Sequence, residues 1–342
     1  MHNISAKLLF LSLLAAAAGA LQACSADAPD ISPAEKKQEM KFAPAEVSRA
    51  TTSSVNYVGS KFAIFADMKH SAGNHVKVFH NVEVEYDGAA WFYDGKQYWI
   101  PEYEHSFVAI HPSHALLNAD GLQYSASRLS FAYSIPTTDG TNIDLSRNHD
   151  LLAATHRRMY TEGAAAAVTL KFGHLMSLVN IAPAFSDNLM TADDYILIRK
   201  LEFSGVCTKA DIEITPAQRL SNTQTDDIEF SITGHTAGKP EIVFSEPFKV
   251  MNKAAGASIF ADSDAVIMFP QAFREDSEAK IIFHFTVNDD SSVRTLSMPL
   301  NGRTWESGKS YLYRATIERT GLNIESCEIT PWNDIRGDIT VD

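Results

Sequence analysis

The chain has 342 residues, of which 45% are hydrophobic, so it is long and apolar enough to fold into about two domains. It carries 29 Lys and Arg residues against 42 Asp and Glu residues, a formal net charge of −13. An acidic surface repels nucleic acid and anionic lipid, which excludes functions that depend on a basic surface.

The first 24 residues have the pattern of an export signal. A basic residue, Lys7, precedes an apolar run (8–21) that is too short for a permanent membrane-spanning helix. The run ends in a Leu-Gln-Ala-Cys sequence whose cysteine is Cys24, and this resembles the processing site of bacterial lipoproteins. The resemblance implies a signal peptide of residues 1–23 and lipid attachment at Cys24. The alternative is an ordinary secretory signal, cut after Ala20 or Ala23.

Residues 24–60 are predicted to form an extended leader. This segment contains three prolines, a charged run at 35–39 and a Ser/Thr-rich stretch at 51–54, so it cannot bury enough surface to fold alone. Within it, Met40-Lys41-Phe42-Ala43 alternates apolar and polar side chains and could pair as a strand if a sheet offered an edge.

From residue 61 onward the chain has short alternating segments separated by turn signals such as Asp87-Gly88, Asp94-Gly95 and Asp139-Gly140. Because no long amphipathic helix follows the signal, β-α-β architectures are disfavoured. We predict an all-β fold of two tandem antiparallel, transthyretin-like β-sandwiches, 61–165 and 166–342, with a linker near 161–167. Short helical turns are expected at 150–156 and 174–179.

A second series of strands begins near Val168. Its expected strands are 168–172, 195–203, 210–214, 228–232, 242–244, 265–269, 281–287, 293–298, 311–318, 322–329 and 338–341.

Five aromatic residues gather on adjoining hairpins of the first sandwich: Trp91, Tyr93, Tyr98, Trp99 and Phe107. Large rings at such positions usually form the core of a sandwich. A flat platform for stacking sugar rings is the alternative interpretation.

Two further cysteines, Cys207 and Cys327, follow Cys24. In an oxidising compartment they could form one disulfide, or they could remain as two buried thiols. Their spacing matches no zinc or redox motif, so no metal is expected.

The sequence contains no recognisable catalytic motif. The segment 302–310 approaches a phosphate-binding loop, but it has five residues between the glycines where four are needed, and a strand follows it. His105, His111 and His114 could form a metal site, although surface or packing roles are favoured. We therefore predict that the chain is not an enzyme and binds no cofactor.

After residue 60 the chain carries a series of short motifs: Phe79-His80-Asn81-Val82, Trp91-Phe92-Tyr93, Tyr98-Trp99-Ile100-Pro101, 106–112, 150–154, 168–177, 308–313 and Ile329-Thr330-Pro331-Trp332. Each motif is weak alone, but their order and spacing are fairly specific. Together they resemble the fimbrillin family, the subunits of Bacteroidales type V pili.

This resemblance implies a mechanism of assembly. Fimbrillins are lipoproteins of the outer membrane surface; an arginine-specific protease removes an N-terminal strand, and a C-terminal strand of another subunit fills the groove. Here the candidate cut lies between Arg49 and Ala50, after a leader strand at 40–47. The candidate donor segment is 333–342, centred on Asp338-Ile339-Thr340-Val341. Expected partners are other fimbrial subunits, the outer membrane through lipid, and a host protein or glycan.

Other interpretations of the same residues remain open. Arg49 could be a solvated linker residue, and 338–341 could be an ordinary last strand of its own sheet. An uncut chain could be an anchor or tip subunit. The alternative function is a monomeric surface lipoprotein that binds a glycan or a host protein.

Overall fold

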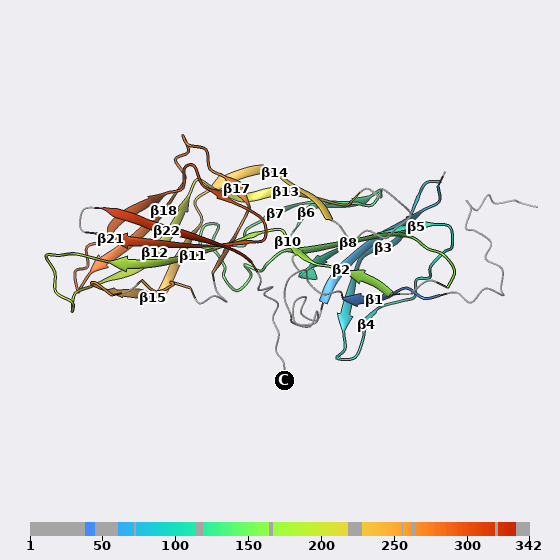
Figure 1. The fold of residues 1–342 in the computed structure, drawn as a ribbon, viewed down its shortest axis with the longest axis horizontal. Helices are drawn as coiled ribbons and strands as arrows, with labels where there is room; N and C mark the ends of the chain where they lie inside the picture. The colour runs from blue at the N-terminus through green and yellow to red at the C-terminus, as the bar shows by residue number, and fades with distance from the viewer. Residues whose placement is uncertain are drawn as a thin grey trace, which may run out of the picture. The chain divides into compact units, whose positions relative to one another are not determined.

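The computed structural model describes residues 38–44, 61–71, 73–113, 119–163, 167–217, 228–254, 256–260, 265–318 and 321–332. Across these residues the chain forms strands β1 to β22 and no helix, which confirms the predicted all-β class (Figure 1). It follows that the described part of the chain has no helix capable of crossing a membrane.

A six-stranded antiparallel sheet forms the centre of the first sandwich. Its strands follow the order β10-β8-β5-β2-β3-β4. Most of β2 and β5 is buried, because other layers cover both faces of this sheet. The bounds are β2 (Lys61–Lys69), β3 (His75–Tyr86), β4 (Trp91–Tyr93), β5 (Glu104–His111), β8 (Leu152–Met159) and β10 (Gly173–His174).

Different layers cover the two faces of the six-stranded sheet. On one face, Phe65 shares a core with Ile212 of a four-stranded sheet ordered β14-β13-β7-β6. On the other face, Phe62 shares a separate core with Val168 of a parallel pair, β1 and β9. The bounds are β1 (Lys41–Pro44), β6 (Asp120–Ser125), β7 (Arg128–Ser134), β9 (Ala167–Leu170), β13 (Val206–Pro216) and β14 (Ile228–Gly238).

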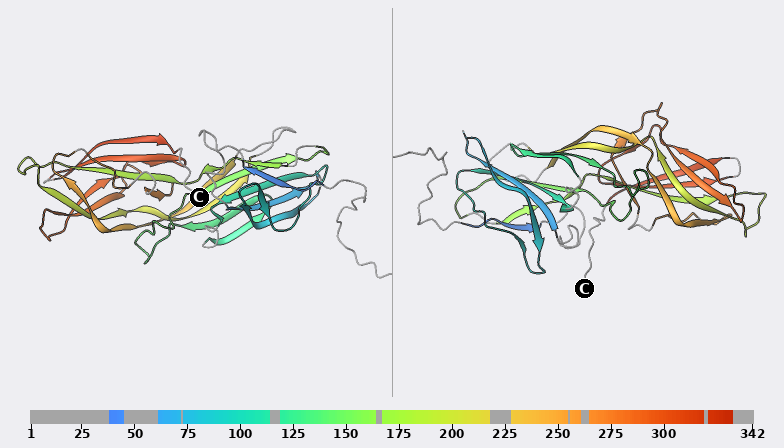
Figure 2. Two further views of the ribbon diagram at one scale, coloured as in Figure 1. Left: turned by 90° about the horizontal axis from the view of Figure 1, so that it is seen from below. Right: turned by 180° about the vertical axis from the view of Figure 1, so that it is seen from behind.

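The second sandwich consists of two four-stranded sheets, seen as separate layers in Figure 2. One is ordered β16-β11-β21-β22 and the other β15-β12-β18-β19. Apolar residues alternate along β12 and β18, so Phe203 and Phe283 point into the core and are fully buried. The bounds are β11 (Ser177–Phe185), β12 (Tyr195–Ser204), β15 (Glu241–Met251), β16 (Val266–Met268), β18 (Lys280–Val287), β19 (Arg294–Pro299), β21 (Lys309–Ile317) and β22 (Leu322–Pro331).

A long antiparallel ribbon is shared by the two sandwiches. β12 continues into β13 through Gly205 alone, and β14 continues into β15 through Lys239 and Pro240. β12 pairs with β15 in the second sandwich, while β13 pairs with β14 in the first. The sheets therefore combine strands from both sides of the predicted boundary at residue 165, and that boundary stays a prediction.

The two predicted helical turns are wrong. Residues 152–156 belong to β8, and the segment expected to be helical at 174–179 contains the ends of β10 and β11. Leu152, Ala153 and Ala154 favour helix locally, but all three are fully buried between the layers. Burial in the sheet therefore outweighs their intrinsic propensity.

The glycine-rich segment 302–310 is a turn, as predicted. Gly302 and Gly308 both have a φ of 69°. The short strand β20 (Thr304–Trp305) pairs with β17 (Gln271–Ala272) and leads into β21. The arrangement lacks the helix N-terminus on which a phosphate-binding loop depends.

Candidate functional site: an aromatic site filled by the leader strand

The leader strand β1 is hydrogen-bonded to two segments that lie far away in the sequence. The Met40 N–H donates to the Gln97 carbonyl oxygen at 2.8 Å, and the Trp99 N–H donates to the Gln38 carbonyl oxygen at 2.9 Å. Further along, β1 runs parallel to β9, with Phe42 opposite Val168. The prediction that the segment beginning at Met40 pairs as a strand is confirmed.

Met40 and Phe42 insert into an aromatic core, and we call their surroundings the leader site. Met40 is 1% exposed and Phe42 is 6% exposed, whereas Lys41 between them faces solvent. The Phe42 ring lies at the centre of four others, with centroid distances of 5.6 Å to Phe79, 5.6 Å to Tyr93, 6.0 Å to Phe62 and 6.3 Å to Phe107. Each contact is edge-to-face, the favoured geometry for aromatic pairs.

The sheet supplies the remaining walls of the leader site. Phe62 on β2, Phe79 on β3 and Phe107 on β5 lie on one face because side chains alternate along each strand. The Tyr93 hydroxyl donates to the Met40 carbonyl oxygen at 3.0 Å, so one aromatic residue contacts both the side chains and the backbone of the leader. Removal of β1 would therefore uncover the rings of Phe62, Phe79 and Phe107.

A polar group of residues closes the Gln38 end of the leader site. We call Trp99, His105, Arg158 and Tyr160 the end cluster. The Tyr160 hydroxyl donates to Gln38 Oε1, and its ring stacks on Trp99 with centroids 5.0 Å apart. The Arg158 guanidinium carbon lies 4.1 Å from the Trp99 ring centroid, a cation–π arrangement.

His105 lies beneath Trp99, with ring centroids 4.8 Å apart, and is fully buried. Its Nδ1 lies 3.0 Å from the Tyr103 carbonyl oxygen, while its Nε2 has no hydrogen-bond partner among the described residues. Burial, together with the nearby positive charge of Arg158, lowers the pKa of His105 to about 4. The imidazole is therefore neutral near pH 7.

The predicted aromatic cluster forms core and not a sugar platform. Trp91 is 9% exposed, Trp99 is 3% exposed and Phe107 is fully buried, so their faces are not available to stack on a ligand. Tyr93 and Tyr98 are half-buried. The platform interpretation of these rings is wrong, because the leader strand and its neighbours cover them.

The two cysteines are free thiols in this structure, so the Cys207–Cys327 disulfide is not formed in it. Burial raises the pKa of Cys207 to about 11 and raises that of Cys327 as well, so both thiols are unreactive near neutral pH.

Four groups of predicted site residues lie outside the described residues. They are the lipidation residue Cys24, the cleavage pair Arg49 and Ala50, the donor residues Asp338, Ile339, Thr340 and Val341, and the third histidine, His114.

The two described histidines of the predicted cluster pack separately. His105 and His111 lie on β5, six residues apart, and the Nδ1 of His111 lies 2.9 Å from the Lys61 carbonyl oxygen. Across the described part of the chain, no three His, Cys, Asp or Glu side chains gather as metal ligands would.

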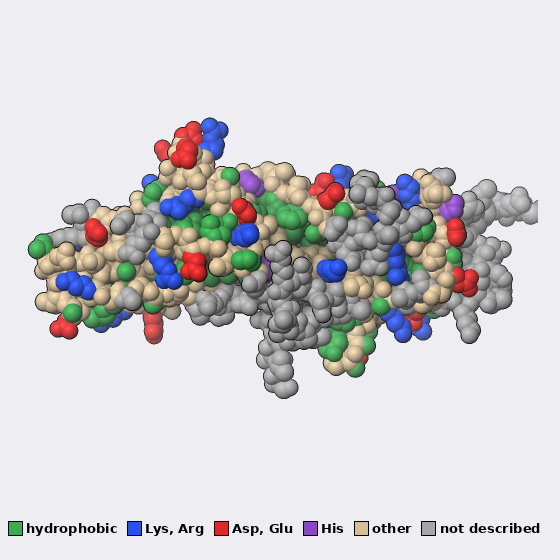
Figure 3. Space-filling model, in the orientation of Figure 1, with side chains coloured by type: hydrophobic (Ala, Val, Ile, Leu, Met, Phe, Trp, Pro, Cys, Tyr) green, Lys and Arg blue, Asp and Glu red, His purple; other side chains and the backbone are tan. Residues whose placement is uncertain are grey.

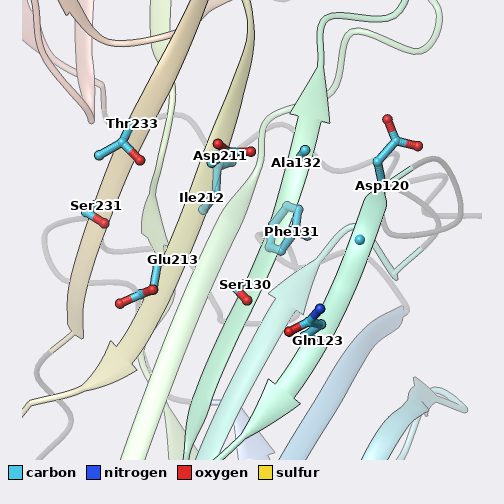
Figure 4. A pocket seen from close by; sticks show the side chains of 11 residues that line it. Asp120, Gln123, Ser130, Phe131, Ala132, Asp211, Ile212, Glu213, Ser231 and Thr233 are labelled. Atoms are coloured by element: carbon cyan, nitrogen blue, oxygen red, sulfur yellow. The ribbon is translucent and has the colours of Figure 1, made fainter.

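A polar hollow of about 380 Å³ lies on the sheet β14-β13-β7-β6. Two cross-strand rows line it: Ala132, Asp211 and Thr233 are opposite one another in the first row, and Ser130, Glu213 and Ser231 in the second (Figure 4). Short side chains make the hollow, and the carboxylates border it. Two of its acids are paired: Asp120 with Lys209 at 2.8 Å, and Glu213 with Arg128 at 3.4 Å.

Charges are mixed over the described surface seen in Figure 3, where acidic and basic side chains alternate and no extended patch of one sign is visible. The net charge of −13 therefore does not mark a single binding face there. Among the described residues, the leader site is the largest departure from ordinary sandwich packing, because a short strand from the leader provides its central side chains.

Sequence reasoning missed the residues that close the leader site. Arg158 and Tyr160 lie at the end of strand β8 and just beyond it, a strand that was expected to be partly helical, and nothing in their spacing connects them with Gln38. The partner of the leader, β9, was predicted as a strand, but its parallel pairing with β1 has no local sequence signal.

A family model matches most of the chain, and solved structures are similar to it in fold. The family model described as "Fimbrillin-like" matches residues 48–332. A fimbrial protein from Bacteroides vulgatus ATCC 8482 is similar in structure, with a TM-score of 0.58, 17% sequence identity, and coverage of 86% of this chain and 99% of that one. A "putative cell adhesion protein" from Bacteroides ovatus ATCC 8483 has a TM-score of 0.50, 18% identity, and coverage of 87% and 98%.

No curated protein sequence matches the chain. At identities below a fifth, the structural similarities establish the fold alone, whereas the family model extends over most of the sequence. The chain belongs to the fimbrillin-like family.

Proposed function

We propose that this chain is a subunit of a surface fimbrium that polymerises by strand exchange at the leader site. The observation that carries the proposal is the burial of Met40 and Phe42, which belong to a short segment whose strand β1 pairs with β9 and not with a strand of the sheet that it covers. A strand from another subunit, with apolar side chains at alternate positions, could restore the same contacts. The strand proposed to occupy the leader site is the segment 333–342 of a neighbouring copy, including Asp338, Ile339, Thr340 and Val341.

The energetics favour a stable polymer. Burial of a Met or Phe side chain contributes roughly 1.5–3 kcal/mol. Leaving Phe62, Phe79 and Phe107 uncovered would expose a contiguous aromatic surface. A subunit that has lost its leader would therefore gain free energy by binding a strand that covers this surface, and adjacent subunits would become partners.

Export as a lipoprotein would bring subunits to the place of assembly. We propose acylation of Cys24, which would hold the unprocessed chain at the outer membrane surface. Cleavage between Arg49 and Ala50 would separate β1 from β2, since β1 ends at Pro44 and β2 begins at Lys61. That cut would release both the leader strand and the lipid anchor.

The test begins with the chain recovered from the cell surface. Intact mass and N-terminal sequencing are compared before and after treatment with an arginine-specific protease. The proposal predicts a new N-terminus at Ala50 and a ladder of SDS-resistant polymers. The variant Arg49→Ala should give neither, and deletion of 333–342 should allow cleavage but prevent polymers. Polymers formed by the deleted chain would refute donation by that segment.

A second candidate function is a surface lipoprotein that binds a glycan or a host protein as a monomer. Because the aromatic rings are buried, its specific support is the polar hollow on β6, β7, β13 and β14. A screen against glycans and matrix proteins tests it, with Ala132→Arg to fill the hollow and Ser134→Arg, at the exposed end of β7, as the matched control. Binding that survives Ala132→Arg would rule out the hollow as the site.

A further inference from the structure

The end cluster is the polar part of an otherwise apolar site. Trp99 is 3% exposed and stacks on Tyr160, while Arg158 lies over both rings, with its guanidinium carbon 4.1 Å and 5.9 Å from the two centroids. Filling an apolar core requires no such group. This end of the site therefore differs in chemistry from the apolar part that holds Met40 and Phe42.

The leader meets the end cluster through one residue. Gln38 accepts a hydrogen bond from the Tyr160 hydroxyl at its Oε1, and its carbonyl oxygen accepts one from the Trp99 N–H at 2.9 Å. His105 adds a buried imidazole nitrogen, Nε2, that has no partner among the described residues. Because the His105 Nδ1 faces the Tyr103 carbonyl oxygen and the ring is neutral, this Nε2 is an acceptor. The donor and the positive charge that the cluster presents come from the Tyr160 hydroxyl and from Arg158.

We infer that the end cluster selects the strand that fills the leader site, accepting strands whose side chain at the Gln38 position carries a carbonyl or carboxylate oxygen. The inference rests on the proposed function and names the chemistry of its partner: a strand of another fimbrial subunit with that oxygen two residues before a buried aliphatic residue and four before an aromatic one. The spacing is that of Gln38, Met40 and Phe42.

The charge of Arg158 determines which oxygen is favoured. A carboxylate at the Gln38 position would accept the Tyr160 hydrogen bond, and the positive charge of Arg158, 5.9 Å from the Tyr160 ring centroid, would favour it, whereas alanine would leave the hydroxyl without its acceptor. A lysine would place two positive charges at one end of the site, where partial burial of both positions weakens screening by water. The expected order of retention is Glu, Gln, Ala and then Lys.

The donor segment proposed for this chain matches only part of the pattern. Asn333 stands two residues before Ile335, the spacing of Gln38 and Met40, but Gly337 falls at the position of Phe42. A peptide of residues 333–342 should therefore depend on its asparagine and bind more weakly than a peptide with the leader sequence.

Hydrogen exchange in the intact chain measures retention directly. The readout is the Met40 amide, which donates to the Gln97 carbonyl oxygen in the folded chain. The Met40 amide should exchange about tenfold faster in Gln38→Ala than in the wild type, and it should exchange more slowly in Gln38→Glu than in the wild type. In an Arg158→Ala background, adding Gln38→Glu should no longer slow the exchange. Lys41→Ala, at an exposed leader position, is the matched control and should change nothing.

Peptide binding separates this inference from the proposed function. The chain is treated with the arginine-specific protease, freed of its leader, and titrated with the 38–44 peptide and its Gln38→Ala and Gln38→Lys versions. Weaker binding of both variants supports selection. Equal binding of all three, or equal Met40 exchange in the intact variants, would overturn selection and leave strand exchange intact. If no peptide binds the leader-free chain, strand exchange at this site is wrong, and selection is wrong with it.

Discussion

Among the described strands, each sandwich contains one parallel pair, and the two pairs are held in different ways. In the second sandwich, β11 and β21 are in register from Leu178–Ser310 to Phe185–Ile317, and β22 covers the other edge of β21. In the first sandwich, the described residues of β1 and β9 are in register from Lys41–Ala167 to Pro44–Leu170. A long ladder of backbone hydrogen bonds holds β21. A short ladder and two large side chains, Met40 and Phe42, hold the leader segment.

Because of this difference, β1 could be removed without dividing a sheet of the first sandwich. The six-stranded sheet of the first sandwich is complete without β1, because β1 pairs with β9 and not with a strand of that sheet. Removing β1 would break few backbone hydrogen bonds but would uncover a large aromatic surface. Removing β21 would divide its sheet in two. Only the first arrangement suits exchange of a strand between subunits.

The largest effect is expected in the second sandwich. Phe283 on β18 is fully buried, so Phe283→Ala should lower the free energy of unfolding by about 4 kcal/mol. Denaturant titration followed by circular dichroism measures the loss. Phe230→Ala on β14, where the ring is 38% exposed, is the control and should cost less than about 1 kcal/mol. Similar losses for both variants would contradict the assignment of Phe283 to the core.

A substitution of similar size in the leader should have a local effect instead. Phe42→Ala should cost about 3 kcal/mol, but mainly for the attachment of β1, which corresponds to roughly a hundredfold loss of hydrogen-exchange protection there. Mass spectrometry compares peptides covering Lys41–Pro44 with those covering Lys309–Ile317. Equal loss of protection in both peptides would show that β1 opens only with the whole chain, and would remove the contrast between the two pairs.

Much of this fold could be predicted from alternation alone. The expected strand 281–287 differs from β18 by one residue at its start, and the expected strand 195–203 differs from β12 by one at its end. Buried alternating residues give a strong local signal because side chains on a strand have a period of two. By contrast, the start of β11 was mistaken for a helical turn, since burial on both faces removes the alternation.

The leader site was harder to predict for a different reason. The apolar residues Met40 and Phe42 marked a strand, but its partner β9 lies more than a hundred residues away, and pairing across that distance has no sequence signal. The end cluster likewise joins Gln38 to Tyr160. The spacing of His105 and His111 allowed a metal site, but in the structure each imidazole packs against a different backbone carbonyl group. Spacing alone does not indicate whether a histidine is buried.

Acid should weaken the first sandwich through His105. Its buried imidazole has a pKa lowered from 6.5 to about 4, so the unfolded chain binds a proton more readily than the folded chain in this range. The free energy of unfolding should be unaffected above pH 6.5 and should fall as the pH drops toward 4, by about 3 kcal/mol in total.

Denaturant titration at several pH values tests this contribution. His105→Gln should flatten the acid slope between about pH 6.5 and about pH 4, because glutamine binds no proton in this range. His235→Gln, at an exposed position of β14, is the matched control and should leave the slope unchanged. If the His105 and His235 variants behave alike, the acid slope has another source.

The smallest effect concerns the ribbon that joins the two sandwiches. Gly205 connects β12 to β13 with a φ of 74°, and a Cβ added there would lie 3.2 Å from the Ala279 Cα. Gly121 has a φ of 64° with open space around it, so Gly121→Ala should show the backbone cost alone, about 1 kcal/mol. Gly205→Ala should show that cost plus a contact penalty, for a total of about 2 kcal/mol. Thermal unfolding of both variants measures the difference between them. An equal loss of stability in the two variants would mean that the backbone at Ala279 moves aside. The connection between β12 and β13 would then be less tightly packed than the paired strands next to it.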